Sequence, residues 1–198
     1  MVRRILSRRG VCTIFSYLRH VLSQREPAID TWGKPAAVMV LIAETPKPAL
    51  LLIRRPDHLS SHAGQIAFPG GRFESTIDQN LWQAAQRETE EEVGIQVPQD
   101  RLLGFLDPVH IQVSGFTLLP AVVGLEERPL VQPASDEVAD YAWVALSDLA
   151  QVRRERPRII GNLTYQMAEF PLSFGLLWGA TARVVDQLIQ TVQGGTPW

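Results

Sequence analysis

The chain has 198 residues, 45% of them hydrophobic and 20% charged, with a formal net charge of −2 at pH 7. These values suit one soluble globular domain, and no run reaches the roughly 18 to 20 apolar residues that a membrane-spanning helix needs. The single cysteine, Cys12, excludes an internal disulfide and fits a reducing compartment. We therefore expect a cytoplasmic protein whose partners include neither a membrane nor a nucleic acid.

The N-terminal segment is strongly basic, because residues 1–25 contain six arginines and no acidic residue. Its apolar residues recur near helical spacing, at Ile5, Val11, Ile14, Phe15, Leu18 and Leu22. The pattern favours a basic N-terminal helical extension over 1–30, within a single domain of residues 1–198. A mitochondrial transit peptide has a similar composition, and phosphate attraction is a third use for such charge. No obvious cleavage boundary follows the segment, which favours the helix.

Past this segment, apolar and β-branched runs predict strands. They cover 36–43, 49–54, 102–106, 117–123 and 141–144, and a long apolar segment over 172–191 predicts a C-terminal helix. Residues 56–71 lack periodicity and are expected to form a loop with tight turns. Because strands and helices are interspersed without a regular βαβ repeat, we expect an α/β (α+β) fold with a mixed β-sheet covered by helices.

A helix with an acidic end is predicted between residues 80 and 94. Asn80 suits the N-cap, with Gln83 at capping-box spacing, and Gly94 suits the helix stop. A solvated acidic face is one interpretation. However, the apolar stripe itself continues into carboxylates, in the order Leu81, Ala84, Ala85, Glu88, Glu91 and Glu92. Because acidic groups repel one another and suit a helix C-terminus poorly, we expect a cation to offset them. Oxygen ligands favour Mg²⁺ or Mn²⁺.

An ordered set of residues resembles the Nudix box, the strand-loop-helix metal site of the Nudix hydrolases: Gly71, Arg87, Glu88, Glu91, Glu92, Gly94 and Ile95. The resemblance implies a Nudix-type α/β/α sandwich and a hydrolase with Mg²⁺ or Mn²⁺ as cofactor. It also implies metal ligands at Glu88, Glu91 and Glu92. This chain departs from the usual box in its loop, which is two residues longer. Ile77 stands where a glutamate is usual, and Glu74 and Asp78 are the acids nearest that place.

The segment before the box is similar to the motif of the coenzyme A pyrophosphatases. It comprises residues 51–55, 58–65 and 68–71, and the apolar run 174–179 is also similar to that subgroup. The resemblance implies cleavage of coenzyme A or its derivatives to 3′,5′-ADP and 4′-phosphopantetheine, and it leaves a homodimer open. Arginine can pair with phosphate and glycine permits close backbone approach. The substrate-binding positions expected are Arg54, Arg55, His62, Gly64, Gln65, Gly70 and Gly71.

Two other functions stay open. One is a pyrophosphatase for another nucleoside diphosphate derivative, such as ADP-ribose or a nucleotide sugar. The other is a Nudix-fold module that binds a nucleotide without catalysis, although a module of that kind need not keep three mutually repelling acids. His58 and His62 are four residues apart, but no third His or Cys has the spacing of a zinc site.

The catalytic roles follow from what pyrophosphate hydrolysis requires, which is an activated water and neutralised phosphoryl oxygens. Arg87 lies on a different helical face from the glutamates and is expected to anchor the helix or orient a glutamate. The general base is open between Glu88 and Glu137, and for Glu137 an ordinary surface acid is the alternative. The full catalytic set expected is Arg87, Glu88, Glu91, Glu92 and Glu137.

Overall fold

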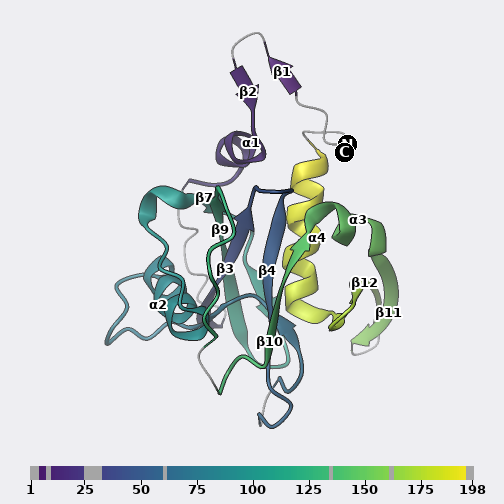
Figure 1. The fold of residues 1–198 in the computed structure, drawn as a ribbon. Helices are drawn as coiled ribbons and strands as arrows, with labels where there is room; N and C mark the ends of the chain where they lie inside the picture. The colour runs from purple at the N-terminus through teal and green to yellow at the C-terminus, as the bar shows by residue number, and fades with distance from the viewer. Residues whose placement is uncertain are drawn as a thin grey trace.

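The computed structural model describes residues 5–7, 10–24, 33–59, 62–133, 136–160 and 163–194 (Figure 1). Its centre is an eight-stranded sheet whose main path has the order β10-β4-β3-β9-β7. These strands span Asp140–Ala145, Ala49–Arg54, Lys34–Ala43, Phe116–Leu125 and Leu102–Phe105. Three short strands lie beside this path: β5 (Ile66–Ala67), β6 (Gly70–Arg72) and β8 (Val109–Ile111).

The sheet is mixed, as predicted. β3 and β9 run parallel along their whole lengths, whereas β3 pairs antiparallel with β4 and β6. All five strands expected from the sequence are present, and β4 has the predicted bounds. The loop expected over 56–71 contains β5 and the start of β6, which bring Gly70 and Gly71 beside β3.

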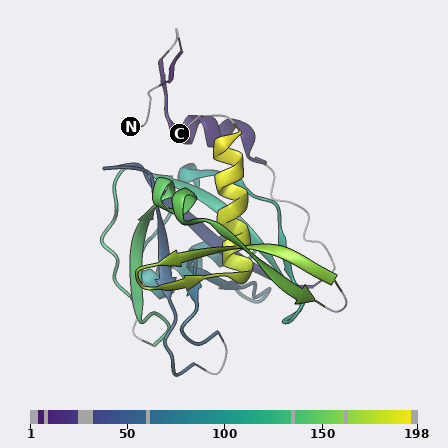
Figure 2. The same cartoon turned by 90° about the vertical axis from the view of Figure 1, so that its right-hand side faces the viewer.

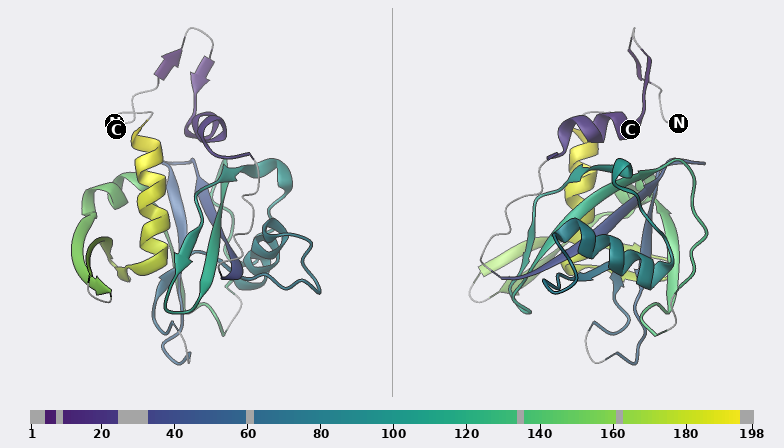
Figure 3. Two further views of the ribbon diagram at one scale, coloured as in Figure 1. Left: turned by 180° about the vertical axis from the view of Figure 1, so that it is seen from behind. Right: turned by 90° about the vertical axis from the view of Figure 1, so that its left-hand side faces the viewer.

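The two faces of the sheet carry separate cores, because successive side chains of a strand point to opposite faces. Val38, Val40 and Ile42 of β3 pack with α4 (Gly179–Gln193). On the other face, Met39 and Leu41 pack with α2 (Leu81–Val93). The two helices lie on opposite sides of the sheet (Figure 3). The α/β/α sandwich expected from the Nudix resemblance is therefore confirmed.

A second, three-stranded sheet follows the helix α3 (Leu146–Val152). Its order is β11-β12-β13, with bounds Arg154–Ile160, Leu163–Leu172 and Gly175–Leu177. Figure 2 shows this hairpin crossing α4 and extending past it. The helix predicted over 172–191 is wrong at its start, since residues 172–177 belong to β12, a turn and β13. An apolar run alone cannot distinguish a buried strand from a buried helix.

The basic N-terminal segment is helical only in part. The described residues form a strand pair, β1 (Ile5–Ser7) with β2 (Gly10–Cys12), and then the helix α1 (Ile14–Val21). Thr13 caps α1 by accepting a hydrogen bond from the Ser16 N–H, and Leu18 is buried in the core shared with α4. The remaining positions of the predicted extension, 1–4, 8–9 and 25–30, lie outside the described residues. None of the helices described combines the length and apolar character of a bilayer-spanning helix.

Candidate active site

Helix α2 is fixed at both ends by the predicted caps. The Asn80 side chain accepts a hydrogen bond from the Gln83 N–H at 2.9 Å, and Gly94 adopts the left-handed conformation, with φ 69°. Leu81 and Ala85, at the N-terminal end of the stripe, and Val93, the last residue of the helix, are buried in the core between α2 and the sheet. The last two turns of α2 are thereby held beside Gly70 and Gly71.

Glu92 is the most buried acid of the helix. Its Oε2 accepts a hydrogen bond from the Gly70 N–H at 2.9 Å, and its Oε1 lies 3.5 Å from Nη1 of Arg55. Burial raises the pKa of Glu92 to about 7, although the Gly70 hydrogen bond and the charge of Arg55 oppose this rise. The charges of Glu88 and Glu137 add to it. The carboxyl is therefore held in a place that disfavours its anionic form.

Glu88 lies directly against Gly71. A Cβ atom at position 71 would stand 2.5 Å from both carboxylate oxygens of Glu88, so only glycine leaves the carboxylate in place. The pKa of Glu88 is raised, first by burial and also by the charges of Glu91 and Glu137, while Arg87 opposes the rise. Glu88 and Glu92 thus flank the glycine pair, each with a raised pKa.

Arg87 connects the helix to the loop before it. Its Nε and Nη2 each lie 3.0 Å from an oxygen of Asp78, and Nη2 also donates to the Arg72 carbonyl at 3.1 Å. Nη1 donates to Glu88 at 2.9 Å and to Glu91 at 3.2 Å. The arginine therefore contacts both the preceding loop and two of the glutamates, although the sequence pattern places it on a different helical face from them.

Asp78 is the acid that meets Arg87. Its side chain is buried, and it also accepts a hydrogen bond from the Glu74 N–H at 2.8 Å. The hydrogen bonds from Arg87 are the main reason that the pKa of Asp78 lies below its ordinary value. Glu74 and Asp78 are the two acids nearest the position where the usual box has a glutamate. Of these two, Asp78 is the one whose side chain contacts Arg87.

The three glutamates predicted as metal ligands are not equivalent. The side chain of Glu91 is 59% exposed and is bound to Arg87, and the side chain of Glu137 is 60% exposed and lies 3.5 Å from Nη2 of Arg55. Within the described part of the chain, no three His, Cys, Asp or Glu side chains are already arranged as a metal-binding group. Glu88 and Glu92 do face the same glycine pair, and together with Glu91 they are called the carboxylate cluster below.

The carboxylate cluster fits a hard divalent cation on two grounds. Its donor atoms are all carboxylate oxygens, the ligands that Mg²⁺ and Mn²⁺ prefer. The raised pKa values of Glu88 and Glu92 show that the neighbouring arginines do not fully compensate the buried negative charge. Glycine at position 71 leaves room where a side chain would displace Glu88.

The predicted substrate-binding residues fall into two groups: some lie at the carboxylate cluster, and the others contact one another or the loop that follows β4. Arg54 forms an ion pair with Asp57 at 2.8 Å, whereas Arg55 joins Glu92 and Glu137 and so lies at the carboxylate cluster. His62 Nδ1 lies 2.9 Å from Gln65 Oε1. Gly64 has a φ of 65°, which favours glycine, and its N–H donates to the Pro56 carbonyl.

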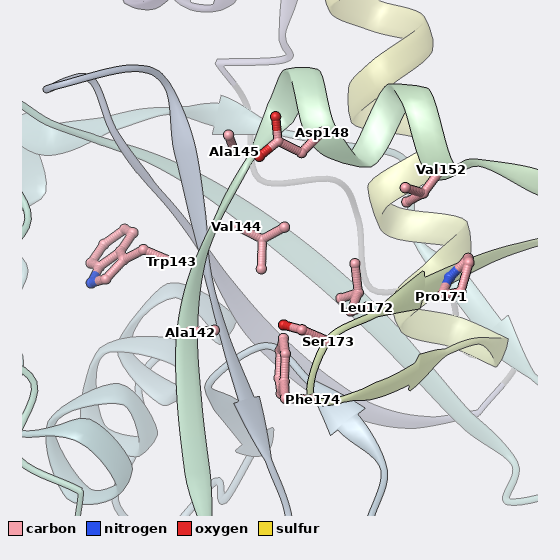
Figure 4. A pocket seen from close by; sticks show the side chains of 10 residues that line it. All are labelled: Ala142, Trp143, Val144, Ala145, Asp148, Val152, Pro171, Leu172, Ser173 and Phe174. Carbon is pink, nitrogen blue, oxygen red and sulfur yellow. The ribbon is translucent and has the colours of Figure 1, made fainter.

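A separate hollow of about 310 Å³ lies between β10, α3 and the turn before β13 (Figure 4). Val144, Leu172 and Phe174 line it, and Asp148 is its only charged lining residue. None of the carboxylate-cluster residues lines this hollow. A site whose lining has one carboxylate and no basic side chain lacks the groups that pyrophosphate chemistry requires, so the hollow is not the candidate active site.

Comparison with known proteins identifies the family. Residues 33–163 match the NUDIX domain, and the chain belongs to the Nudix family. It is 36% identical over 163 residues to the "Uncharacterized Nudix hydrolase NudL" of Pectobacterium atrosepticum, covering 78% of this chain and 81% of the relative. The relative of the same name from Yersinia enterocolitica is 35% identical over 177 residues, covering 88% of this chain and 90% of the relative.

Solved structures agree on the fold. The Nudix domain of Shewanella oneidensis NrtR, complexed with ADP ribose, superposes with a TM-score of 0.56 at 18% identity, covering 84% of this chain and 93% of that one. The Nudix hydrolase RenU of M. smegmatis gives a TM-score of 0.55 at 21% identity, covering 83% and 89%. At these identities the likeness establishes the architecture only.

Proposed function

We propose that this protein is a Mg²⁺- or Mn²⁺-dependent hydrolase of a pyrophosphate bond, and that coenzyme A or a derivative is its substrate. The observation that carries the chemistry is the placement of Glu88 and Glu92 against Gly70 and Gly71, braced by Arg87. The Nudix family supports hydrolysis. The substrate class is supported by the likeness of residues 51–71 to the coenzyme A pyrophosphatase motif.

In this proposal the carboxylate cluster holds the ion, and the residues around the cluster hold its carboxylates in place. Glu88, Glu91 and Glu92 would hold the divalent ion, which when bound supplies charge neutralisation of the phosphoryl oxygens and activation of water. Arg87 holds Glu88 and Glu91, and Asp78 fixes Arg87 in turn. The Gly70 N–H orients the Glu92 carboxylate. These fixed partners reduce the side-chain reorganisation that ion binding requires.

The general base is proposed to be Glu137 or Glu88. Glu137 is mostly exposed, lies beside Arg55, and is close enough to Glu88 and Glu92 to affect their titration. A base must reach the attacking water within hydrogen-bond distance, and an exposed carboxylate at the cluster's edge has that freedom. Glu137→Gln should lower kcat at saturating Mg²⁺ without raising the Mg²⁺ concentration for half-maximal activity if Glu137 is the base. An unchanged kcat would assign the role to Glu88.

The test of substrate class uses the purified protein with coenzyme A, ADP-ribose and NADH, in Mg²⁺ and in Mn²⁺, with chromatographic separation of products. Formation of 3′,5′-ADP from coenzyme A is the expected result. ADP-ribose is the second candidate, because the NrtR Nudix domain binds that molecule in the same fold. Hydrolysis of ADP-ribose alone would reject the coenzyme A assignment, and no hydrolysis of any substrate would favour a nucleotide-binding module.

A matched pair of variants on α2 tests the metal site. Glu92→Gln removes a buried carboxylate that touches Gly70. Glu90→Gln removes an exposed carboxylate of the same helix, which instead pairs with Gln96. Turnover should fall by about 100-fold or more in the first variant, the usual scale for losing a group that organises the transition state, and by less than about twofold in the second. Equal activities in the two variants would reject the metal-site assignment.

A further inference from the structure

The outer face of the β11–β12 hairpin carries a row of arginines that the proposed chemistry does not use. Arg154, Arg156 and Arg158 alternate along β11, so their side chains share one face. All three reach the carboxylate of Glu169 on β12, at 4.0, 3.7 and 2.9 Å. Glu169 is buried, whereas each arginine side chain is about half exposed. One carboxylate is therefore shared by three guanidinium groups, and the face keeps a positive charge.

The same region also exposes aromatic and aliphatic side chains. Tyr165 is the cross-strand neighbour of Arg158, and the Arg158 guanidinium lies 5.6 Å from the Trp178 ring centroid. Both aromatic residues are exposed. At the end of the hairpin, Ile159 is 78% and Leu163 61% exposed. Large apolar groups held in water at a projecting end are typical of an interaction surface.

The hairpin is anchored from behind. Ala168 and Phe170 alternate with Glu169 along β12, so they point to the other face, where they are buried in the α4-side core. Leu177 of β13 is buried in the same core. The outer face therefore carries the basic groups, with Leu163 on the same face at the projecting end, whereas Ile159 lies at that end on the opposite face.

We propose that the outer face of the β11–β12 hairpin, together with its projecting end, docks on an anionic lipid bilayer. The arginines would meet lipid phosphates, Ile159 and Leu163 would enter the interfacial region, and Tyr165 and Trp178 would lie at headgroup level, where amphipathic rings are favoured. The expectation that no membrane partner exists rests on the lack of a spanning run, and docking on a surface requires no such run.

A bilayer fits this face better than the other polyanions do. A single-stranded nucleic acid would use the arginines and the aromatic rings, but it offers nothing to the aliphatic residues of the hairpin end. An anionic membrane surface accepts both kinds of group at once, because phosphates lie directly above the hydrocarbon. The combination of Arg156 with Ile159 and Leu163 is therefore the feature that selects the occupant.

The test is flotation of the full chain with vesicles of phosphatidylcholine alone and of phosphatidylcholine mixed with phosphatidylglycerol. We expect binding to the mixed vesicles only, weakened by added salt. Arg156→Gln should weaken binding by about fivefold, the effect of one basic residue near an anionic surface. Arg101→Gln removes the same charge from an arginine paired with Glu126 far from the hairpin in sequence, and it should leave binding unchanged. Ile159→Ser with Leu163→Ser should also weaken binding.

Each outcome decides the proposal. Arg156 and the two aliphatic residues are exposed, and Arg158 keeps the closest contact with Glu169, so these variants should stay folded; circular dichroism checks this. No binding to either vesicle type would overturn bilayer docking and favour a nucleic acid or an acidic protein on this face. Equal effects of Arg156→Gln and Arg101→Gln, or no effect of the paired serine substitutions, would also overturn it, because binding would then follow net charge alone.

Discussion

Substitution of Asp78 tests whether the longer loop supplies the partner of Arg87. Asp78→Asn keeps the size of the side chain but replaces one acceptor oxygen by an N–H donor. That donor must face either the Arg87 guanidinium or the Glu74 N–H, both of which donate to Asp78 in the native structure. The variant therefore loses a charge-assisted hydrogen bond and places two donors against each other.

The expected loss of stability in Asp78→Asn depends on how deeply Asp78 and Arg87 are buried. The Asp78 side chain is only 3% exposed, but Arg87 is 21% exposed and can regain some water. Breaking a buried ion pair costs about 3–5 kcal/mol, and a hydrogen bond to a charged group contributes about 1.5–3 kcal/mol. Because Arg87 keeps access to solvent and to the Arg72 carbonyl, we expect the lower end, about 2 kcal/mol, or a Tm decrease of about 4–8 °C for a chain of this size.

The assay is urea and thermal unfolding of the metal-free protein, together with the Mg²⁺ dependence of hydrolysis. Arg87, once released from Asp78, would bind Glu88 and Glu91 more closely, so half-maximal activity should need more Mg²⁺. Glu74→Gln is the control, since Glu74 contributes its backbone N–H rather than its carboxylate to the contact. If Asp78→Asn changed stability by less than about 0.5 kcal/mol, or if Glu74→Gln matched it, the pairing of Asp78 with Arg87 would have no energetic role.

Two further predictions concern the glycine pair and the buried acid. Gly71→Ala should raise the Mg²⁺ concentration for half-maximal activity about tenfold or more, because the new methyl group displaces the Glu88 carboxylate; an unchanged Mg²⁺ titration would contradict this. Its free energy of unfolding should change little, since the flexible end of Glu88 can move aside. The pKa of Glu92 is about 7 in the folded protein, compared with an ordinary value of 4.5. Between pH 4.5 and 7 the folded protein therefore binds more protons than the unfolded chain does. The free energy of unfolding of the metal-free protein should therefore fall as pH rises from 4.5 to 7, by at most about 3 kcal/mol from this group, and Glu92→Gln should flatten that slope. An equal slope in Glu92→Gln would assign it to other residues.

Local signals in the sequence were sufficient for β4 and for helix α2. The bounds of β4 follow from an uninterrupted apolar run, and Asn80 and Gly94 cap α2 through hydrogen bonds to near neighbours. The hairpin β11–β12 could not be predicted in this way. Its exposed strand alternates arginine with other residues and lacks an apolar run, and β12 packs on a core whose other members are distant in sequence.

The sequence predicts which residues compose the candidate site, but not how these residues pair with one another. The glutamates and Arg87 follow from the ordered spacing of the box. The partner of Arg87 does not, because Asp78 and Glu74 are equally near in sequence and only the path of the loop distinguishes them. Arg55 is a similar case. Its position after β4 suggested phosphate binding, whereas the fold places its guanidinium between Glu92 and Glu137.

Charge balance around α2 gives the remaining argument for a cation. Two guanidinium groups, those of Arg55 and Arg87, face five carboxylates, which belong to Asp78, Glu88, Glu91, Glu92 and Glu137. With all five ionised, these seven groups carry a net charge of −3, because each arginine is shared by two or three carboxylates. The elevated pKa of Glu92 shows one way in which the protein limits this cost, by taking up a proton. A divalent cation would remove the same cost without a proton, and it would bind more tightly as pH rises through 7, because Glu92 must lose its proton before it can act as a ligand.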